Sequence, residues 1–264
     1  MLSRIVRPKE DFAEEFEPKA ISIGNRKGGV GKTTLTTVVG RELEKAGFNL
    51  VLLDLDSQTD LTDVNVEGAY SNDLFDLLTG RGIVGDVLLD ISAGEAGSLK
   101  IIPGSPKVDD INVDLEENLQ EIVEGLKVEA DIVLLDHPPG YSSISRAGYA
   151  ASDRVLITVN AEMLSFKNLE RLMERIEQVK EEMNSELSIA GVAVNKLDYR
   201  RNLTEKMLEK YRKKYPELTF ENTIGVDSGI PNSQLFNGNL RELPWRARTL
   251  SQFERVAGEL LHRL

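Results

Sequence analysis

The chain has 264 residues, of which 41% are hydrophobic, so it is long enough to bury a sizeable core as one large α/β domain or two small domains. The absence of cysteine excludes disulfides, iron–sulfur clusters, thiolate metal sites and cysteine nucleophiles. With only two histidines, His137 and His262, a histidine-based metal site is not expected. A formal net charge of −12 repels nucleic acid, so any contact with DNA requires a local basic patch.

Short apolar runs alternate along the chain with segments of helical periodicity. The runs end in polar residues, Gly or Pro, which is typical of buried parallel strands. They are residues 20–24, 50–54, 99–103, 132–136, 154–160 and 189–195, and the predicted helices are residues 33–46, 115–126, 165–183, 202–215 and 249–264. This alternation predicts an α/β fold with a doubly wound, mostly parallel sheet and a ligand at the carboxyl ends of its strands.

The polar, charged start of the chain, residues 1–18, is predicted to be a peripheral extension, and residues 19–264 a single domain. The extension does not resemble a signal peptide, and no apolar run is long enough to cross a bilayer. We therefore expect a cytoplasmic protein.

A glycine-rich loop joins the first predicted strand to the first helix. Residues 27–34 read Lys-Gly-Gly-Val-Gly-Lys-Thr-Thr and match the phosphate-loop pattern G-x-x-x-x-G-K-[ST], except that Arg26 replaces its first glycine. Glycines let backbone N–H groups turn towards phosphate oxygens, and the helix start adds its positive dipole end. The loop predicts a P-loop domain that binds a nucleoside triphosphate and Mg²⁺. The backbone of Gly28, Gly29, Val30 and Gly31 would hold phosphates, Lys32 would reach the β- and γ-phosphates, the Thr33 hydroxyl would ligate Mg²⁺, and Thr34 would contact the α-phosphate.

Carboxylates end two other predicted strands. Asp54 and Asp56 are two residues apart, so their side chains point to the same side of an extended chain. Asp136 ends an apolar strand in the manner of a Walker B motif, which carries an acid to the Mg²⁺ region.

These motifs together resemble the ParA/MinD family of ATPases. Its deviant Walker A motif has a second, signature lysine, which is Lys27 here. Residues 54–58 resemble its D-x-D-P-Q segment with Ser57 in place of proline, and residues 136–139 resemble its D-x-P-P segment. Residues 73–80, 99–105 and 158–162 resemble further family segments in the same order. His137 is expected to be a strand-end histidine without a chemical role.

The resemblance implies a slow ATP hydrolase that acts as a switch. ATP would join two subunits face to face, with Lys27 of each reaching the phosphates of the other, as an arginine finger does. Asp56 would position or activate the attacking water, and Asp54 would support the Mg²⁺ shell. The implied catalytic set is Lys27, Lys32 and Asp56, and the metal set is Thr33, Asp54 and Asp136. A ParB-like or adaptor protein would stimulate hydrolysis, and the dimer would partition or position plasmid or chromosomal DNA or another cargo.

The sequence defines the nucleotide base, adenine or guanine, less narrowly. Residues 195–198 match N-K-x-D, the guanine-specifying motif of GTPases, whereas in ParA-like ATPases a strand-end asparagine at this place contacts adenine. We therefore predict ATP, with Asn195 at the base, and GTP remains the alternative.

A basic segment near the C-terminus is the candidate DNA surface. Residues 196–214 hold eight basic and three acidic residues, and a second group includes Arg246 and Arg248. Such clusters contact phosphate backbones without reading sequence, and the same region binds nonspecific DNA in ParA-type ATPases. However, residues 224–230 lack two arginines that the family carries there, so a solvated helix face remains the alternative. The candidates are Arg200, Arg201, Lys206, Lys210, Lys213, Arg246 and Arg248. If they bind DNA, the protein is associated with the nucleoid.

Two other classes of function stay open. One is a MinD-like or other positioning ATPase that does not act on DNA. Its membrane-bound form is disfavoured, because residues 249–264 mix acidic and basic residues and are expected to dock on the core. The other is an enzyme with a chemical substrate, such as an amidoligase, although no second substrate motif is found.

Overall fold

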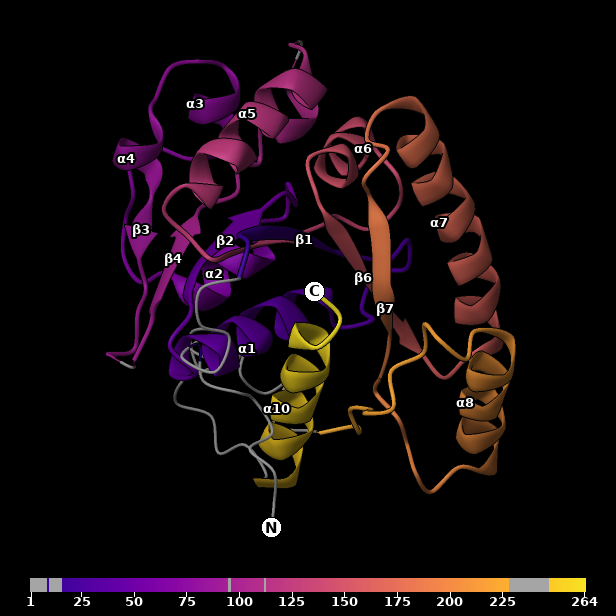
Figure 1. Ribbon diagram of the computed structural model, residues 1–264. Coiled ribbons are helices and arrows are strands. Elements are labelled where there is room, and N and C mark those ends of the chain that lie inside the picture. The colour runs from indigo at the N-terminus through magenta and orange to yellow at the C-terminus, as the bar shows by residue number, and fades with distance from the viewer. Residues whose placement is uncertain (1–8, 10–15, 95, 112, 228–246) are drawn as a thin grey trace.

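The computed structural model describes residue 9 and residues 16–94, 96–111, 113–227 and 247–264. They form a seven-stranded sheet in the order β3-β4-β2-β5-β1-β6-β7 (Figure 1). All neighbouring strands are parallel except β3, which runs antiparallel to β4. The strands are β1 (Lys19–Gly24), β2 (Asn49–Asp54), β3 (Leu89–Asp90), β4 (Ser98–Ile102), β5 (Ile132–Asp136), β6 (Arg154–Asn160) and β7 (Ser188–Asn195). The predicted doubly wound, mostly parallel sheet is confirmed.

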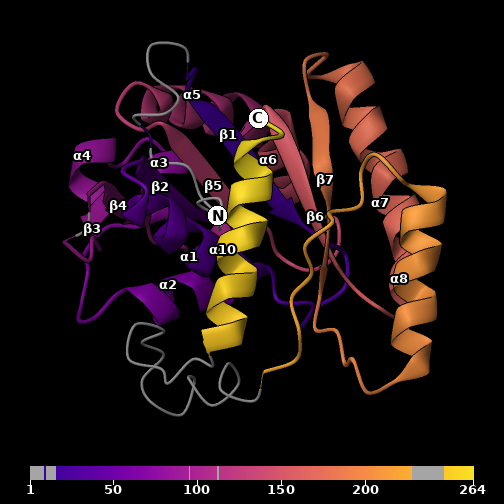
Figure 2. The same ribbon diagram turned by 60° about the horizontal axis from the view of Figure 1, so that its bottom comes forward.

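Helices cover both faces of the sheet. The longer ones are α1 (Lys32–Lys45), α5 (Leu115–Lys127), α6 (Ser143–Ala150), α7 (Met163–Glu182), α8 (Asn202–Lys214) and α10 (Ala247–Leu261). Helices α1 and α10 pack together on one face, α5 and α6 lie on the other, and α7 and α8 share a cluster with β6 and β7 (Figures 1 and 2). None of these described helices is long and apolar enough to span a membrane.

Side-chain alternation along the strands explains the two covered faces. In β2, Leu50 and Leu52 pack in the cluster beneath α1 and α10, whereas Val51 and Leu53 pack in the cluster beneath α5. A strand with apolar residues on both faces must be buried on both, which a helix-covered parallel sheet achieves.

The last helix docks on this core, as predicted. Phe253, Val256, Ala257 and Leu260 of α10 are fully buried in the cluster that contains α1 residues. Figure 2 shows α10 lying lengthwise beside α1 and the sheet. The apolar face of this helix is therefore occupied by the core.

The strand order places a topological switch point next to β1. From β1 the chain moves to β2 on one side, and from β6 it moves to β7 on the other. Ligands of open α/β sheets bind at such a point, at the carboxyl ends of the strands. The loop that follows β1 lies there.

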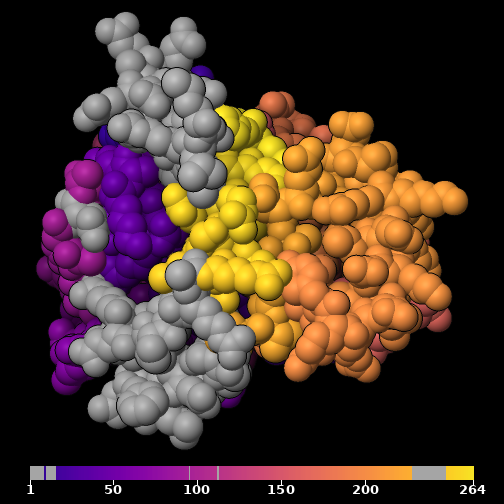
Figure 3. Space-filling view, turned by 90° about the horizontal axis from the view of Figure 1, so that it is seen from below, coloured from indigo at the N-terminus to yellow at the C-terminus, as the bar shows by residue number. Residues whose placement is uncertain are grey.

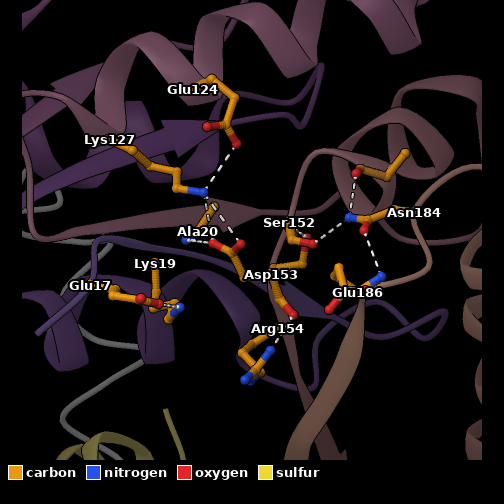
Figure 4. A network of polar contacts seen from close by, with 12 residues as sticks. Glu17, Lys19, Ala20, Glu124, Lys127, Ser152, Asp153, Arg154, Asn184 and Glu186 are labelled. Atoms are coloured by element: carbon orange, nitrogen blue, oxygen red, sulfur yellow. Dashed lines mark hydrogen bonds and ion pairs between the residues drawn. The ribbon is translucent and has the colours of Figure 1, made fainter.

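A polar network lies at the amino ends of β1 and β6, opposite the carboxyl ends where the loop after β1 lies (Figure 4). Asp153, just before β6, accepts a hydrogen bond from the backbone N–H of Ala20 in β1 at 2.7 Å. Lys127 at the end of α5 contacts both Asp153 and Glu124, at 3.2 and 3.1 Å. Asp153 thereby ties together β1, β6 and α5.

Replacing Asp153 by alanine is expected to lower the free energy of unfolding by about 1–3 kcal/mol, because the N–H of the buried Ala20 loses its acceptor. Urea denaturation measures this loss, and nucleotide affinity should not change because the network lies away from the loop after β1. In the control, Glu124→Gln removes the exposed partner of Lys127 and should change stability by less than about 1 kcal/mol. Equal losses in the two variants would contradict the anchoring role of Asp153.

Two described residues of the N-terminal extension contact the body of the protein. Lys9 pairs with Asp131 at 2.8 Å, and the ring of Phe16 packs edge-on against Phe48 with centroids 5.2 Å apart. The predicted division of the chain at residue 18 stays a prediction.

Candidate nucleotide-binding site

The loop between β1 and α1 has the backbone that a phosphate cradle requires. Gly29 and Gly31 have φ values of 72° and 93°, in a region that favours glycine. A side chain on Gly31 would collide with the amide of Asn195. Helix α1 has no acidic residue in its first turn, so its positive end is available for an anion. Two of the three predicted loop glycines, Gly29 and Gly31, thus occupy positions that favour glycine.

The first residues of α1 face the end of β5. Lys32 is buried, and the Thr33 hydroxyl donates to the Asp136 carboxylate at 2.7 Å. The Thr36 hydroxyl, which the motif did not identify, lies 3.3 Å from the other Asp136 oxygen. Thr34, the next residue of α1, is half-buried. The predicted lysine, threonine and Walker B aspartate therefore converge at one place.

Two buried carboxyls lie next to each other here, because the register of β2 and β5 pairs Asp54 with Asp136. Burial, and then the charge of Asp54, raise the pKa of Asp136 to about 7. Burial also raises the pKa of Asp54 to about 6. A bound cation would lower the raised pKa values of these two carboxyls and so stabilise their ionised forms.

The residues fit a Mg²⁺ ion that is held jointly with a nucleotide. Among the described residues, no three acidic or histidine side chains are grouped to hold a metal by themselves. Mg²⁺ in phosphate sites binds one or two carboxylates together with phosphate oxygens and waters. The Thr33 hydroxyl and the Asp136 carboxylate offer this donor set.

Asp54 and Asp56 have different contacts, although they are two residues apart. One Asp54 oxygen accepts from the Asp56 N–H at 3.1 Å, and the other accepts the N–H and hydroxyl of Thr62 at 2.9 and 2.7 Å. The Thr62 hydroxyl in turn accepts from the Gly104 N–H at 2.8 Å. Asp54 thus fixes the loop after β2. Among the described residues, the Asp56 carboxylate accepts only the N–H of Gln58, at 3.0 Å, and the Asp56 backbone carbonyl accepts the N–H of Thr59 at 2.9 Å.

The signature lysine has a partner within its own chain. Lys27 Nζ lies 2.6 Å from a carboxylate oxygen of Glu162, and the two side chains are 30% and 53% exposed. The hydrogen bond from Lys27 lowers the pKa of Glu162. The Lys27 N–H donates to the side chain of Asn25, whose amide donates to the Thr158 carbonyl. Sequence reasoning gave no role to Asn25, or to Glu162, although Glu162 ends the segment 158–162 that resembles the family.

The last residue of β7, Asn195, and the residue that follows it, Lys196, contact the same loop. The Asn195 amide donates to the Val30 carbonyl at 3.0 Å, and its oxygen accepts the Lys196 N–H at 2.7 Å. Lys196 Nζ donates to the Gly29 carbonyl at 2.6 Å. The adenine contact of Asn195 stays a prediction.

His137 is a core residue. Its Nε2 lies 2.7 Å from the Ser22 hydroxyl, and its ring stacks on Tyr149 with centroids 4.2 Å apart. Burial and the charge of Lys32 lower the pKa of His137 to about 3, so the ring is neutral at pH 7. That His137 has no chemical role stays a prediction.

The candidate DNA residues divide into paired and free side chains. Arg200 pairs with Asp198 at 2.8 Å, Lys210 lies 4.2 Å from the Phe166 ring centroid, and Arg248 lies 5.0 Å from that of Tyr199. Arg201, Lys206 and Lys213 are exposed, and within the described residues their side chains have no ion pair or hydrogen bond. The surface in and around α8 adjoins that of α10, which carries Arg248 (Figure 3). Arg246 lies outside the described residues.

Comparison with known proteins identifies the family. A family model described as an AAA domain matches residues 18–189, more than half of the chain. The chromosome-partitioning ATPase Soj of Treponema pallidum is 28% identical over 242 residues, 89% of this chain and 90% of that protein. The sporulation initiation inhibitor protein Soj of Bacillus subtilis is 29% identical over 214 residues, 78% of this chain and 83% of that protein. The chain belongs to the ParA/MinD family of P-loop ATPases.

A solved structure shows the same fold in this family. The septum site-determining protein MinD of Pyrococcus horikoshii, complexed with Mg-ADP, superposes with a TM-score of 0.75 at 21% identity, covering 91% of this chain and 94% of that one. The ParA/MinD fold thus accommodates a nucleotide and Mg²⁺ in that relative.

Proposed function

We propose that the chain is a ParA-like partition or positioning ATPase. It binds ATP and Mg²⁺, forms a face-to-face homodimer through Lys27, and binds nonspecific DNA through the surface around α8. A ParB-like or adaptor protein stimulates its slow hydrolysis, which releases the dimer. The convergence of Lys32, Thr33 and Asp136 beneath the glycine loop is the observation that carries the proposal.

The place of each residue supports a role in this function. The N–H groups of residues 28–31 and the Lys32 ammonium hold phosphates, and Thr33 and Asp136 hold Mg²⁺. Mg²⁺, when bound, neutralises charge on the β- and γ-phosphates. Asp54 supports the ion indirectly, since it holds the loop after β2. Asp56 stands in this loop, where it positions the attacking water.

DNA binding is supported by three free cations on one helix and its cap. Arg201 immediately precedes α8, and Lys206 and Lys213 lie on it, all exposed. Free cations release counterions when they meet phosphates, so binding would be nonspecific and salt-dependent. A protein engaged in this way would be cytoplasmic and associated with the nucleoid.

We expect the triple variant Arg201→Ala/Lys206→Ala/Lys213→Ala to weaken ATP-dependent binding to nonspecific duplex DNA at least tenfold. The slope of log affinity against log salt should fall by about 3, since each phosphate contact contributes roughly one unit. Fluorescence anisotropy with ATP, ADP or no nucleotide measures both quantities. The control variant Arg81→Ala/Lys100→Ala/Lys107→Ala removes equal charge from the segment 81–107, whose strands β3 and β4 lie at the opposite end of the strand order from β7, and should leave the slope unchanged.

A positioning ATPase that acts on a protein platform is the second candidate. Part of the basic segment is neutralised internally, because Arg200 pairs with Asp198 and Lys214 with Glu170. If wild-type protein dimerises with ATP but does not bind DNA, this second candidate replaces the first.

A further inference from the structure

Two carbonyl groups of the phosphate loop accept hydrogen bonds from the side chains of Asn195, the last residue of β7, and Lys196, which follows it. The Asn195 side chain holds the Val30 carbonyl, and the Lys196 ammonium holds the Gly29 carbonyl. The contacts join residues 165 and 167 positions apart in the chain, so they exist only because the sheet places β7 near β1.

Peptide geometry converts these contacts into an orientation of N–H groups. In a planar trans peptide the C=O and the following N–H point in opposite directions. Holding the Gly29 carbonyl therefore turns the Val30 N–H away from Lys196, and holding the Val30 carbonyl does the same for the Gly31 N–H. Neither N–H donates a hydrogen bond to a residue that the structure describes, so both are available for phosphate oxygens.

The backbone of Lys196 has an unfavourable conformation in this arrangement. Its φ of 53° lies in the left-handed region, which costs a residue with a side chain roughly 1–2 kcal/mol. Burial, and then the charge of Lys27, lower the pKa of Lys196, so its ammonium is also partly desolvated next to another cation. An anionic ligand in the loop would reduce the repulsion between the Lys27 and Lys196 ammonium groups.

We propose that Lys196 is a positioning residue for the nucleotide: its ammonium, by holding the Gly29 carbonyl, fixes the Val30 N–H in the direction of the phosphates. A charged donor also polarises the peptide and strengthens the hydrogen bond from its N–H. This role rests on the proposed nucleotide binding. It depends on the amine of Lys196 and not on the backbone conformation of residue 196.

The test is a titration of Lys196 variants with ATP and ADP in the presence of Mg²⁺. Lys196→Met keeps most of the stem and removes the ammonium, and should raise the Kd of both nucleotides about tenfold, the value of a hydrogen bond to a charged group. Lys196→Arg, which retains a cationic donor, should recover part of the affinity. Lys167→Met, which changes an exposed lysine of α7, should bind as wild type does.

The variant Lys196→Gly separates the effect of the Lys196 ammonium on the phosphate loop from the effect of the positive φ at residue 196. Glycine takes a positive φ without strain, so the nucleotide-free variant should melt at the same or a higher temperature while its Kd rises as in Lys196→Met. Wild-type affinity in both Lys196→Gly and Lys196→Met would overturn the proposal. If wild-type protein binds neither ATP nor GTP, the proposed function fails instead, and preferential GTP binding would change only the base.

Discussion

Replacing Asp56 by asparagine is expected to lower the kcat of ATP hydrolysis by about 10²- to 10⁴-fold, the usual contribution of a carboxylate that handles the proton of an attacking water. The amide keeps the size of the side chain and can still accept the Gln58 N–H, so the loop should keep its shape. It cannot accept a proton from water at neutral pH. The variant should therefore fold and bind ATP like wild type and accumulate in the ATP-bound dimer.

The matched control is the same change two residues earlier. Asp54→Asn puts an amide N–H₂ where the structure needs an acceptor, because Asp54 accepts hydrogen bonds on both oxygens. It should lower the free energy of unfolding by about 2–3 kcal/mol, whereas Asp56→Asn should change it by less than about 0.5 kcal/mol. Urea denaturation and single-turnover hydrolysis separate the two effects. Wild-type hydrolysis by Asp56→Asn would show that another group positions the water.

Most of the fold could be predicted because the strands carry their own signal. The apolar runs that end in Asp54 and Asp136 are buried on both faces, and their predicted limits agree with β2 and β5 within one residue. The elements that the pattern missed are short. β3 has two residues, α2 (Asp60–Asn65) and α4 (Val84–Val87) have six and four, and α6 has eight. Apolar periodicity also missed the five-residue α3 (Leu74–Leu78), but the resemblance of residues 73–80 to a family helix marked its place. Helices of one or two turns are too short for the apolar repeat of a helix to be recognised in the sequence.

The candidate site was predictable only where its residues form a local motif. Lys32 and Thr33 stand in one glycine-rich pattern, and Asp136 ends one apolar strand. The residues that contact the glycine-rich loop from outside come from distant segments. Glu162 contacts Lys27 across 135 positions of the chain, and Lys196 contacts Gly29 across 167. The resemblance of residues 158–162 to a family segment assigns no role to Glu162, since that role depends on where β6 ends relative to β1. The fold must be known before such contacts can be inferred.

Replacing Lys27 by alanine is expected to abolish partner-stimulated hydrolysis, with a loss of about 10³-fold or more, as for an arginine finger supplied by a second subunit. ATP-dependent dimerisation, measured by light scattering, should weaken as well. The affinity of one subunit for ATP should fall little, because Lys32 and the loop N–H groups remain. Glu162→Gln is the matched variant: it releases Lys27 from its partner in the same chain, and should strengthen dimerisation by up to about fivefold, as expected for an exposed ion pair.

Mixing two inactive variants determines whether Lys27 acts on its own nucleotide or on that of the partner. In a mixed dimer of Lys27→Ala and Asp56→Asn subunits, the Lys27→Ala subunit keeps its own Asp56 and receives Lys27 from its partner. That site is complete if Lys27 acts across the interface, and the other site lacks both groups. Equal mixing should then restore up to roughly a quarter of wild-type hydrolysis, because half of the dimers are mixed and each has one complete site of two. If Lys27 acts within its own subunit, both sites of the mixed dimer lack an essential group and no activity returns. Absence of rescue in mixtures shown to contain mixed dimers would therefore reject the sandwich arrangement, whatever the single variants do.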